Sequence, residues 1–518
     1  MAQYTRNYLY IYITQAVSML LGMLSLFIVI PSISSNKELY GIYSLCSSLT
    51  IFFSYADIGF VSAGQKFAAE AYIRGEREHE LKILGFSGSV LFLFLFLISC
   101  ILCIFAWQPA FLIKNINGDD VFIARQLLLI LACSSPIFCF LRLSQLIYSI
   151  RLSDYSFQLM QIGGNVVKIL SVFWFFGGGR YDIVGYYLNI QIISLLVVMM
   201  SYVVAKRKYN VSFQKLLSCF HFKKDIFNEL KGLAIASLFG TICWILYYEL
   251  DNIAISRLLG AEAVAIYAIA FSILSVFRSI FSMCFSPYPT RFNYFVGLKD
   301  YNGLNKFVKT IMEFFLPVVL IPIIVMSIVA GPFISTWVGD GYEESTMVLS
   351  CLLFCNVLAF TNNPCGLYVT ALQKNRFLYI SNAIIVIVFW GGVFISYKQL
   401  GVLSFAVMKA VGMIFGAIYS YIIVFKLMKE SGGRFALQLI KHYLVPVLCC
   451  VGLSMLIQPF MFHGKDSKLL LFNIMIFLAI CISSYLCFLP FSKLQRDKMS
   501  MLYNIVKARI KEVVVKDK

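Results

Sequence analysis

Continuous apolar runs recur along the whole chain, and they limit what this sequence can fold into. Many are at least about 18 residues long, which is enough for a helix to cross the hydrocarbon core of a bilayer. In lipid, only helices and closed barrels satisfy all of their backbone hydrogen-bonding groups. Because the runs are continuous rather than alternating, they favour helices. We therefore predict an all-α integral membrane protein.

The amino-acid composition agrees with this interpretation. Of the 518 residues, 60% are apolar and 13% are charged, whereas soluble domains carry about 45–50% apolar and about 25% charged residues. A formal net charge of +18 would suggest nucleic-acid binding in a soluble protein. In a membrane protein the positions of the charges matter more than their sum, so we expect no nucleic-acid partner.

Fourteen candidate transmembrane helices can be placed on the sequence. Their approximate limits are 8–33, 42–64, 84–106, 123–149, 157–178, 184–205, 232–256, 263–286, 310–330, 346–372, 379–397, 402–425, 443–461 and 468–491. With the N-terminus in the cytoplasm, the inner loops and tails carry 31 Lys and Arg residues, and the outer loops carry 7. Such an excess marks the cytoplasmic side. The charge bias therefore predicts that both termini are cytoplasmic.

Two short matches indicate an internal repeat. Residues 38–43 read ELYGIY and residues 262–267 read EAVAIY, at an offset of 224. A proline followed nine residues later by a glutamine occurs at Pro136 and again at Pro364, at an offset of 228. Both matches relate one span to the sixth span after it. We therefore predict two pseudo-symmetric six-helix lobes followed by two further helices, and duplicated halves are typical of secondary transporters.

The repeat and the charge pattern divide the chain into five parts. We expect an N-lobe with helices 1–6 at 1–205, a basic cytoplasmic linker at 206–231, a C-lobe with helices 7–12 at 232–425, helices 13–14 at 426–491 and a basic cytoplasmic tail at 492–518. The linker and the tail carry closely spaced cationic residues. We expect them to be attracted to anionic membrane lipids.

Cationic side chains within the spans are candidate binding residues. A charge at the centre of the bilayer costs about 2.5–3.5 kcal/mol on insertion scales, so it usually faces a cavity or a partner. The candidate lumen cations are Arg142, Lys168, Arg278 and Lys409. Snorkelling is the alternative for the two arginines, and pairing with a carboxylate is the alternative for Lys168. The excess of cations in the inner halves of the spans favours an anionic substrate, such as a phosphate-bearing lipid.

Polar residues share one helix face in three of the spans. The second span carries Ser47, Thr50, Ser54 and Asp57, the seventh carries Trp244, Tyr248 and Asp251, and the eighth carries Ser275, Arg278 and Ser282. Their spacing of three and four residues places each set on one side of its helix. The aromatic face beside a carboxylate suits sugar rings, and it equally suits helix packing. Asp57 and Asp251 are candidate coupling groups, although Asp57 is also suited to pairing with a lumen cation.

Motifs for soluble catalysis are missing from the sequence. There is no G-x-x-x-x-G-K-[ST] segment, which argues against a P-loop nucleotide site. The four histidines have no metal-ligand spacing, and no loop carries paired carboxylates or a nucleophile–base set. We therefore expect no enzyme activity, no cofactor and no metal site. A lysine in the twelfth span, Lys409, precedes a Gly412–Gly416 pair that predicts close helix packing.

Three segments carry a resemblance to a known family. LYGIYSLCSSLTIFFSYADIGF at 39–60, LDNIAISRLLGAEAVAIYAIA at 250–270 and ALQKNRFLYIS at 371–381 resemble the polysaccharide-export flippases. These include the O-antigen flippases of Wzx type, which belong to the multidrug/oligosaccharidyl-lipid/polysaccharide (MOP) superfamily. The resemblance covers nearly the whole chain. It identifies the family and leaves the glycan open.

The resemblance implies an activity, a location and partners. The family translocates an undecaprenyl-diphosphate-linked oligosaccharide, such as an O-antigen unit for lipopolysaccharide, from the inner to the outer leaflet of the bacterial inner membrane by alternating access. By position, the lumen arginines would be Arg142 and Arg278, and the carboxylate of the Asp-x-Gly motif would be Asp57. A polysaccharide polymerase and its chain-length machinery are further candidate partners.

Two other functions remain open at this point. A drug/cation antiporter of the same superfamily would usually have twelve spans and acidic lumen residues, so spans 13–14 and the cationic excess count against it. A membrane-embedded polysaccharide polymerase or ligase would need a large outer loop with catalytic residues. No outer loop of that size occurs in the sequence.

Overall fold

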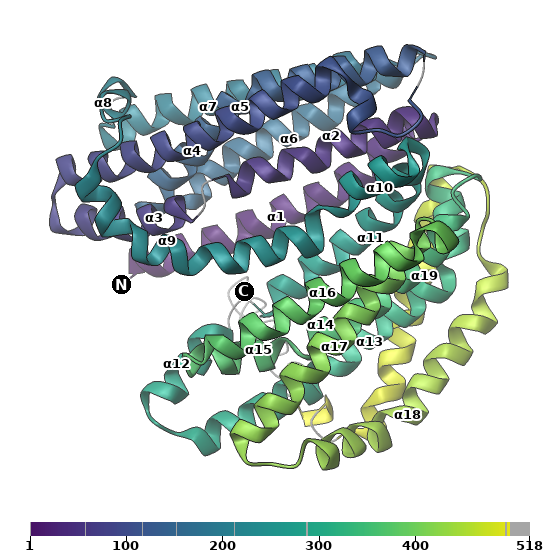
Figure 1. The fold of residues 1–518 in the computed structure, drawn as a ribbon. Coiled ribbons are helices and arrows are strands. Elements are labelled where there is room, and N and C mark those ends of the chain that lie inside the picture. Colours follow the sequence, from purple (N-terminus) through teal and green to yellow (C-terminus); the bar gives the residue numbers. More distant parts are fainter. Residues whose placement is uncertain are drawn as a thin grey trace, which may run out of the picture. The chain divides into compact units, whose positions relative to one another are not determined.

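All regular elements that the structure describes are helices, as predicted (Figure 1). The computed structural model describes residues 2–56, 59–116, 118–151, 153–211, 213–285, 288–492 and 495–497. The chain divides into two compact units, unit 1 (1–269) and unit 2 (270–518). The division falls inside one long helix. The lobe boundaries predicted at 205 and 232 remain a prediction.

Unit 1 contains the elements up to the first part of α11. These are α1 (Ala2–Ile33), α2 (Lys37–Tyr55), α3 (Phe60–Arg74), α4 (Arg77–Trp107), η1 (Pro109–Phe111), α5 (Asp119–Ile150), α6 (Asp154–Phe176), α7 (Ile183–Tyr209), α8 (Phe213–Ser218), α9 (Lys224–Trp244), η2 (Ile245–Glu249) and α10 (Asp251–Leu259). The helix α11 (Ala261–Phe285) continues into unit 2. Helices α9 and α10 belong to unit 1 because they pack against α3 and α2.

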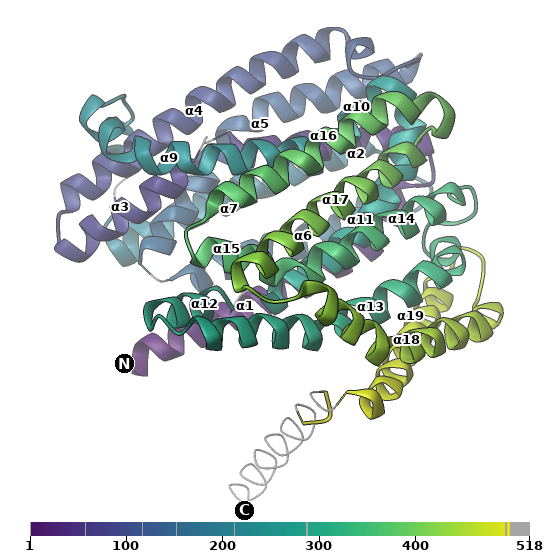
Figure 2. The same cartoon turned by 60° about the horizontal axis from the view of Figure 1, so that its bottom comes forward.

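Unit 2 contains the rest of α11 and the elements that follow it. These are α12 (Tyr288–Gly297), α13 (Tyr301–Val338), α14 (Glu344–Thr361), α15 (Asn363–Ala371), α16 (Asn375–Leu400), α17 (Leu403–Met428), α18 (Gly432–Ile457), η3 (Gln458–Phe460), α19 (Ser467–Phe488) and η4 (Leu489–Phe491). The last two long helices, α18 and α19, pack against each other and against α13 (Figure 2). They correspond to the predicted pair of helices 13–14.

The protein is a multi-pass membrane protein. Among the described residues, twelve helices are long and apolar enough to cross a membrane, and the number is thirteen if the bent pair α2–α3 forms one span. These coincide with thirteen of the predicted spans. The predicted seventh span, 232–256, is instead divided among α9, the π-helical η2 and α10. The orientation of the termini remains a prediction.

The second span is bent, whereas the sequence predicted one continuous helix at 42–64. Helices α2 and α3 meet at an angle of 43°. Gly59, which precedes α3, has a φ of +80°. That left-handed conformation is strained for residues with a Cβ atom and is readily adopted by glycine. The glycine therefore permits the change of direction that the hydropathy pattern alone does not reveal.

The same helix packing recurs in both units. In unit 1, α3 packs on α4, α4 on α5, α5 on α7 and α6 on α7. In unit 2, α12 packs on α13, α13 on α14, α14 on α17 and α16 on α17 (Figures 1 and 2). Each pair in unit 2 lies six spans after its counterpart. This agrees with the repeat predicted from the sequence and with two pseudo-symmetric six-helix lobes.

The two copies of the repeated ELYGIY and EAVAIY segments lie against each other. The Lys37 ammonium lies 3.4 Å from the Glu262 carboxylate. A Cβ atom on Gly41 would lie 1.9 Å from the carbonyl oxygen of Ala261. Only glycine therefore lets α2 approach the first turn of α11 so closely, which explains the glycine in the first copy of the segment.

The Gly412–Gly416 pair in α17 confirms the predicted close packing. A Cβ atom on Gly412 would lie 2.9 Å from the carbonyl oxygen of Ile385, and one on Gly416 would lie 2.4 Å from the Ile385 side chain. Lipid tails are as apolar as leucine, so helices in a membrane associate largely through such close van der Waals contact. Because these two glycines have no side chain, α16 and α17 can lie in close contact.

We predict that Gly412→Ala lowers the thermal stability of the purified protein. The new methyl group must displace the backbone of α16, and overpacking of this kind costs about 1–3 kcal/mol. The matched control is Gly391→Ala on α16, where a Cβ atom meets nothing within 4 Å. Thermal unfolding in detergent gives the melting temperature of each variant. Equal melting temperatures for the two variants would contradict the close-packing interpretation.

Candidate functional site

A short π-helical turn in unit 1 creates a polar site beside two aromatic rings. The turn, η2, interrupts the predicted seventh span between α9 and α10. Trp244, the residue directly before η2, donates a hydrogen bond of 3.1 Å from Nε1 to Glu249 Oε1, five residues later. A π turn brings residues i and i+5 to the same side of the helix, which an α-helix does not do. The Glu249 carboxylate is consequently buried against the helix.

Aromatic rings form an open face next to this carboxylate. The ring centroids of Trp244 and Tyr248 lie 4.2 Å apart, and Tyr247 packs edge-on to Tyr248 with centroids 4.6 Å apart. Trp244 is 39% exposed. The predicted aromatic face is therefore formed, and its acidic neighbour is Glu249 rather than Asp251. Exposed aromatic surface next to a carboxylate offers both a stacking face and a hydrogen-bond acceptor.

Asp251 lies in a second buried polar group that joins α10 to α2 and α11. The Tyr267 hydroxyl donates to Asp251 Oδ2, and Asp251 is 2% exposed. The neighbouring Asn252 Nδ2 donates a 2.5 Å hydrogen bond to Ser48 Oγ on α2. Glu249 also accepts a 3.5 Å hydrogen bond from the hydroxyl of Tyr55 at the end of α2. Two buried carboxylates thus lie where α2 contacts η2 and α10.

The predicted polar stripe of α2 is only partly buried. Ser47 and Thr50 are half-buried, and Ser54 is exposed. Thr50 donates to the carbonyl oxygen of Cys46 at 3.1 Å, which satisfies its hydroxyl within the helix. Tyr43 interacts with Ser47, and Tyr187 on α7 interacts with Thr50. Asp57 lies outside the described residues.

The predicted cations of unit 1 have neutral hydrogen-bond partners. Arg142 on α5 is half-buried and donates from Nη1 to Gln145 Oε1 at 2.7 Å, while its buried Nε has no hydrogen-bond acceptor among the described residues. Lys168 on α6 donates from Nζ to Ser194 Oγ on α7 at 2.9 Å. Neither of these neutral partners cancels the positive charge. No described contact joins Arg142 to Lys168.

Unit 2 holds two cations around one buried thiol. Arg278 on α11 and Lys409 on α17 both act electrostatically on Cys355 of α14. Lys409 is fully buried, and its ammonium lies 5.3 Å from the Phe389 ring centroid and 5.9 Å from that of Phe271. Arg278 is half-buried. The structure therefore brings these two predicted residues into one neighbourhood.

The serines predicted on either side of Arg278 differ in exposure. Ser275 is half-buried, and its hydroxyl donates to the carbonyl oxygen of Ser272 at 2.7 Å. Ser282 is exposed. Within the part of the chain that the structure describes, no three His, Cys, Asp or Glu side chains are placed to hold a metal ion.

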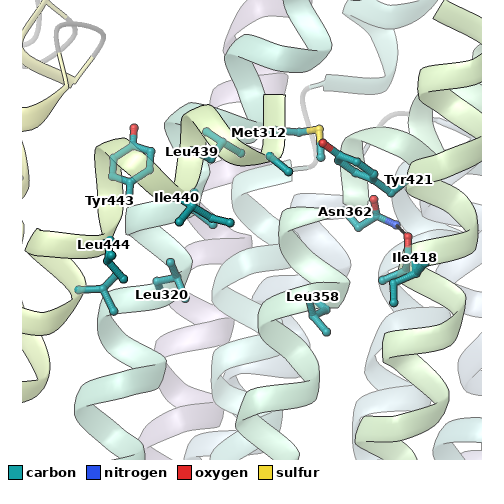
Figure 3. A pocket seen from close by; sticks show the side chains of 14 residues that line it. Met312, Leu320, Leu358, Asn362, Ile418, Tyr421, Leu439, Ile440, Tyr443 and Leu444 are labelled. Atoms are coloured by element: carbon teal, nitrogen blue, oxygen red, sulfur yellow. Dashed lines mark hydrogen bonds between the residues drawn. The ribbon is translucent and has the colours of Figure 1, made fainter. Parts of the chain in front are cut away.

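An apolar pocket of about 460 Å³ lies within unit 2 (Figure 3). It lies between α13, α14, α17 and α18, and its walls are mainly aliphatic side chains. Its polar lining groups are Asn362, Tyr421 and Tyr443. Sequence analysis did not predict this pocket, because its walls come from two separate parts of the chain, the pair α13–α14 and the pair α17–α18.

Sequence analysis also missed a buried ion pair at the ends of the spans in unit 1. Arg151 Nη2 lies 2.5 Å from Glu80 Oε1, and the exposed fractions of the two side chains are 2% and 1%. The Arg151 guanidinium also lies over the rings of Tyr72 and Tyr209. The two charged residues are 71 positions apart, so no local pattern pairs them. Glu249 was missed for a related reason, since α-helical spacing does not place it beside Trp244.

Comparison with known proteins gives structural matches only. No family model matches the sequence, and no curated protein matches it. The lipid II flippase MurJ in an inward closed conformation superposes with a TM-score of 0.67, at 14% identity, over 93% of this chain and 99% of that one. A multidrug resistance MATE family transporter of the MOP superfamily, inward-facing, gives a TM-score of 0.58 at 14% identity over 80% and 94%.

A third structure extends the same result. A MATE transporter in complex with MaD3S gives a TM-score of 0.53 at 14% identity over 82% of this chain and 96% of that one. The chain shares its fold with these three solved structures. At these identities the likeness concerns the fold alone, and the Wzx-type family, the substrate and the site residues remain predictions.

We predict that Glu80→Ala strongly destabilises the protein. Removing one partner of a buried ion pair leaves the other charge uncompensated, which costs about 3–5 kcal/mol. The double variant Glu80→Leu/Arg151→Met is expected to regain much of this stability, because it removes both charges. Thermal unfolding in detergent tests this.

The control for this prediction is Glu78→Ala. The Glu78 side chain is 94% exposed and lies 3.8 Å from Lys82, and exposed pairs of this kind contribute little. A melting temperature of Glu80→Ala equal to that of Glu78→Ala would contradict the importance of the buried pair.

Proposed function

We propose that this protein is a flippase that moves an undecaprenyl-diphosphate-linked oligosaccharide from the inner to the outer leaflet of the bacterial inner membrane. An O-antigen unit or a similar repeat unit would be the cargo, and alternating access would be the mechanism. The observation that carries the proposal is a set of cationic side chains within a MOP-superfamily fold. Those side chains are Arg142, Lys168, Arg278 and Lys409.

The cations of unit 1 have neutral hydrogen-bond partners, which suits them to an anionic ligand. Arg142 and Lys168 hydrogen-bond to the neutral Gln145 and Ser194. A guanidinium presents its N–H groups in a planar fork that matches phosphate oxygens, so Arg142 suits one end of a diphosphate. The buried Nε of Arg142 lacks an acceptor among the described residues. A phosphate oxygen would supply one.

Arg278 and Lys409 are suited to the same class of ligand. Both act on Cys355, so they concentrate positive charge in one part of unit 2. Lys409 is fully buried, which suits it to raising the local positive potential without contacting the cargo. Arg278 is half-buried, so in this proposal it is the member of the pair that would bind the cargo directly.

The glycan would contact the aromatic face of unit 1. Trp244 and Tyr248 lie together next to the Glu249 carboxylate. Sugar rings offer C–H groups that pack on aromatic rings and hydroxyls that donate to carboxylates. Ser47, Thr50, Ser54, Ser275 and Ser282 are further polar groups suited to glycan hydroxyls. Among the structures with the same fold, the lipid II flippase MurJ is named for a lipid-linked cargo.

A deletion strain gives the direct test of this function. Loss of surface polysaccharide, with complete lipid-linked units accumulating on the inner leaflet, is the expected result. Accumulation of single units that have already crossed the membrane would instead indicate a polymerase. Complementation by the unaltered chain confirms that the phenotype comes from this protein.

We predict that Arg278→Ala abolishes complementation while the membrane level of the protein stays normal. Losing a charge-assisted hydrogen bond removes about 1.5–3 kcal/mol of binding free energy, which weakens the affinity for the cargo by about tenfold or more. Arg278→Lys should retain part of the activity, because a lysine keeps the charge and loses the planar fork. Arg376→Ala, an exposed arginine of α16, is the control. Wild-type polysaccharide in Arg278→Ala would overturn the assignment of Arg278.

The buried carboxylates are candidate coupling groups. A carboxylate held in an apolar region binds a proton or a cation readily, because burial disfavours its charged form. Asp251 is the predicted coupling residue that the structure describes, and Glu249 lies two residues before it. Together with Asp57, they would respond to an ion gradient across the membrane.

We predict that Asp251→Asn removes the dependence of flipping on the ion gradient. The asparagine can still accept a hydrogen bond from Tyr267, so packing is conserved while the charge is lost. The measurement is the amount of lipid-linked glycan that reaches the outer leaflet before and after an ionophore is added. Asp466→Asn, at the cap of α19, is the control. An unchanged ionophore response in Asp251→Asn would contradict the coupling role.

The same carboxylates favour a second candidate, a drug/cation antiporter. Acidic groups buried within spans suit cationic substrates, and a multidrug resistance MATE transporter shares the fold. In that case the deletion strain would keep its surface polysaccharide and become sensitive to cationic drugs. The four membrane-embedded cations make this the weaker proposal.

A further inference from the structure

We propose that the pocket in unit 2 binds one chain of an anionic glycerophospholipid from the surrounding bilayer. This site is separate from the cations and carboxylates assigned to the cargo, and it does not depend on the proposed function. The pocket lies between α13, α14, α17 and α18 (Figure 3). Binding of such a lipid requires only that unit 2 is embedded in a membrane.

The walls of the pocket continue into surface that would face lipid. Ile418 on α17 is 52% exposed and Ile440 on α18 is 57% exposed, and both also line the pocket. Exposed leucine and isoleucine side chains continue beyond it along the same two helices. In a membrane protein such side chains contact acyl chains. A chain of a neighbouring lipid can therefore enter the pocket without crossing a polar barrier.

The size and chemistry of the pocket fit one alkyl chain. Its volume of about 460 Å³ lies within the usual range for small-molecule sites. The Tyr421 hydroxyl donates to Gly432 O at 2.8 Å, and the Tyr443 hydroxyl donates to Glu313 O at 3.3 Å. Both phenols are thus satisfied within the protein. The two tyrosines therefore offer the pocket the apolar surface of their rings and no hydroxyl group that still needs a hydrogen-bond acceptor.

One polar atom of the lining still lacks a partner. Asn362 Nδ2 donates to Ala417 O at 3.3 Å, while the buried Oδ1 of Asn362 has no hydrogen-bond donor among the described residues. A buried acceptor without a donor is costly. Because this Oδ1 atom is buried within the protein, the lining that an acyl chain would meet remains apolar.

Charge at the rim selects an anionic headgroup. Arg434 and Lys441 are exposed on α18, and Lys441 directly follows the lining residue Ile440. Of the acidic groups on the adjoining segments, Glu430 pairs with Lys309 at 2.5 Å, and Glu313 interacts with the His442 ring. Arg434 and Lys441 therefore add positive charge to the exposed side of α18, and such charge attracts anionic lipid headgroups.

A lipid chain at this place would fill the gap between α17 and α18. The two helices make few direct contacts, and α18 is held mainly by α13 and α19. A bound chain would contact both α17 and α18, so it would tie the pair α18–α19 to the rest of unit 2. Phosphatidylglycerol carries the negative charge and the acyl chains that suit the site.

The test measures phospholipid that remains bound to the purified full-length chain. Ala436→Phe, which places a ring into the pocket from α18, should lose about one phosphatidylglycerol per protein molecule by native mass spectrometry, because a filled pocket cannot admit a chain. Leu437→Phe, at the neighbouring exposed position that does not line the pocket, should keep it. If Ala436→Phe does not fold, the alternative variant is Ile418→Trp on α17, which fills the opening of the pocket.

A second pair of variants tests the headgroup. Arg434→Gln/Lys441→Gln should reduce the preference for phosphatidylglycerol over phosphatidylcholine, and it should reduce the gain in melting temperature when phosphatidylglycerol is added. Lys398→Gln, an exposed lysine at the C-terminal end of α16, is the matched control.

Three outcomes would overturn the proposal. The first is an unchanged lipid count in the pocket-filling variants. The second is equal binding of the two phospholipids by the unaltered protein. The third is displacement of the bound phospholipid by polyprenyl phosphate, which would assign the pocket to the tail of the cargo. None of these outcomes depends on the complementation test of the proposed function, so the two proposals fail separately.

Discussion

Every polar group that enters the hydrocarbon region must find a partner inside the protein, and the rest of this structure depends on that constraint. Backbone groups meet it by forming helices. Side chains meet it across helix pairs, as Asn252 does with Ser48 and Tyr267 with Asp251. Arg142 Nε and Asn362 Oδ1 are among the exceptions, since neither atom has a hydrogen-bond partner among the described residues. Arg142 belongs to the proposed cargo site.

Close approach of helices without a hydrophobic driving force requires small residues. Two glycines at distant points of the chain allow such close approach, Gly41 next to Ala261 and Gly412 next to Ile385. Both contacts involve glycines that the sequence patterns singled out, one in a repeated segment and one in a small-residue pair. Besides this contact with α11, α2 also packs against η2 and α10, which carry Glu249 and Asp251.

The proposed cargo and the proposed lipid use different parts of this scaffold. The diphosphate would meet cations within the spans, while the phospholipid would occupy an apolar pocket whose charge lies only at the rim. The distinction is physical. A phosphate drawn into the membrane region needs desolvated cationic partners, whereas a bilayer lipid keeps its headgroup in water and inserts only its chain.

The sequence by itself determined the fold class, nearly all of the spans and the six-span repeat, because hydropathy and helix period are local properties of the chain. It also showed that Arg278 and Lys409 lie within apolar runs, since a charge inside such a run is visible without a structure, and their role stays a prediction. Only the tertiary structure decided which residues meet. It paired Glu80 with Arg151, turned Glu249 toward Trp244 through a π turn and assembled the apolar pocket from four helices. These features depend on contacts between distant segments, or on a change of helical register, and no local pattern of residues records either one.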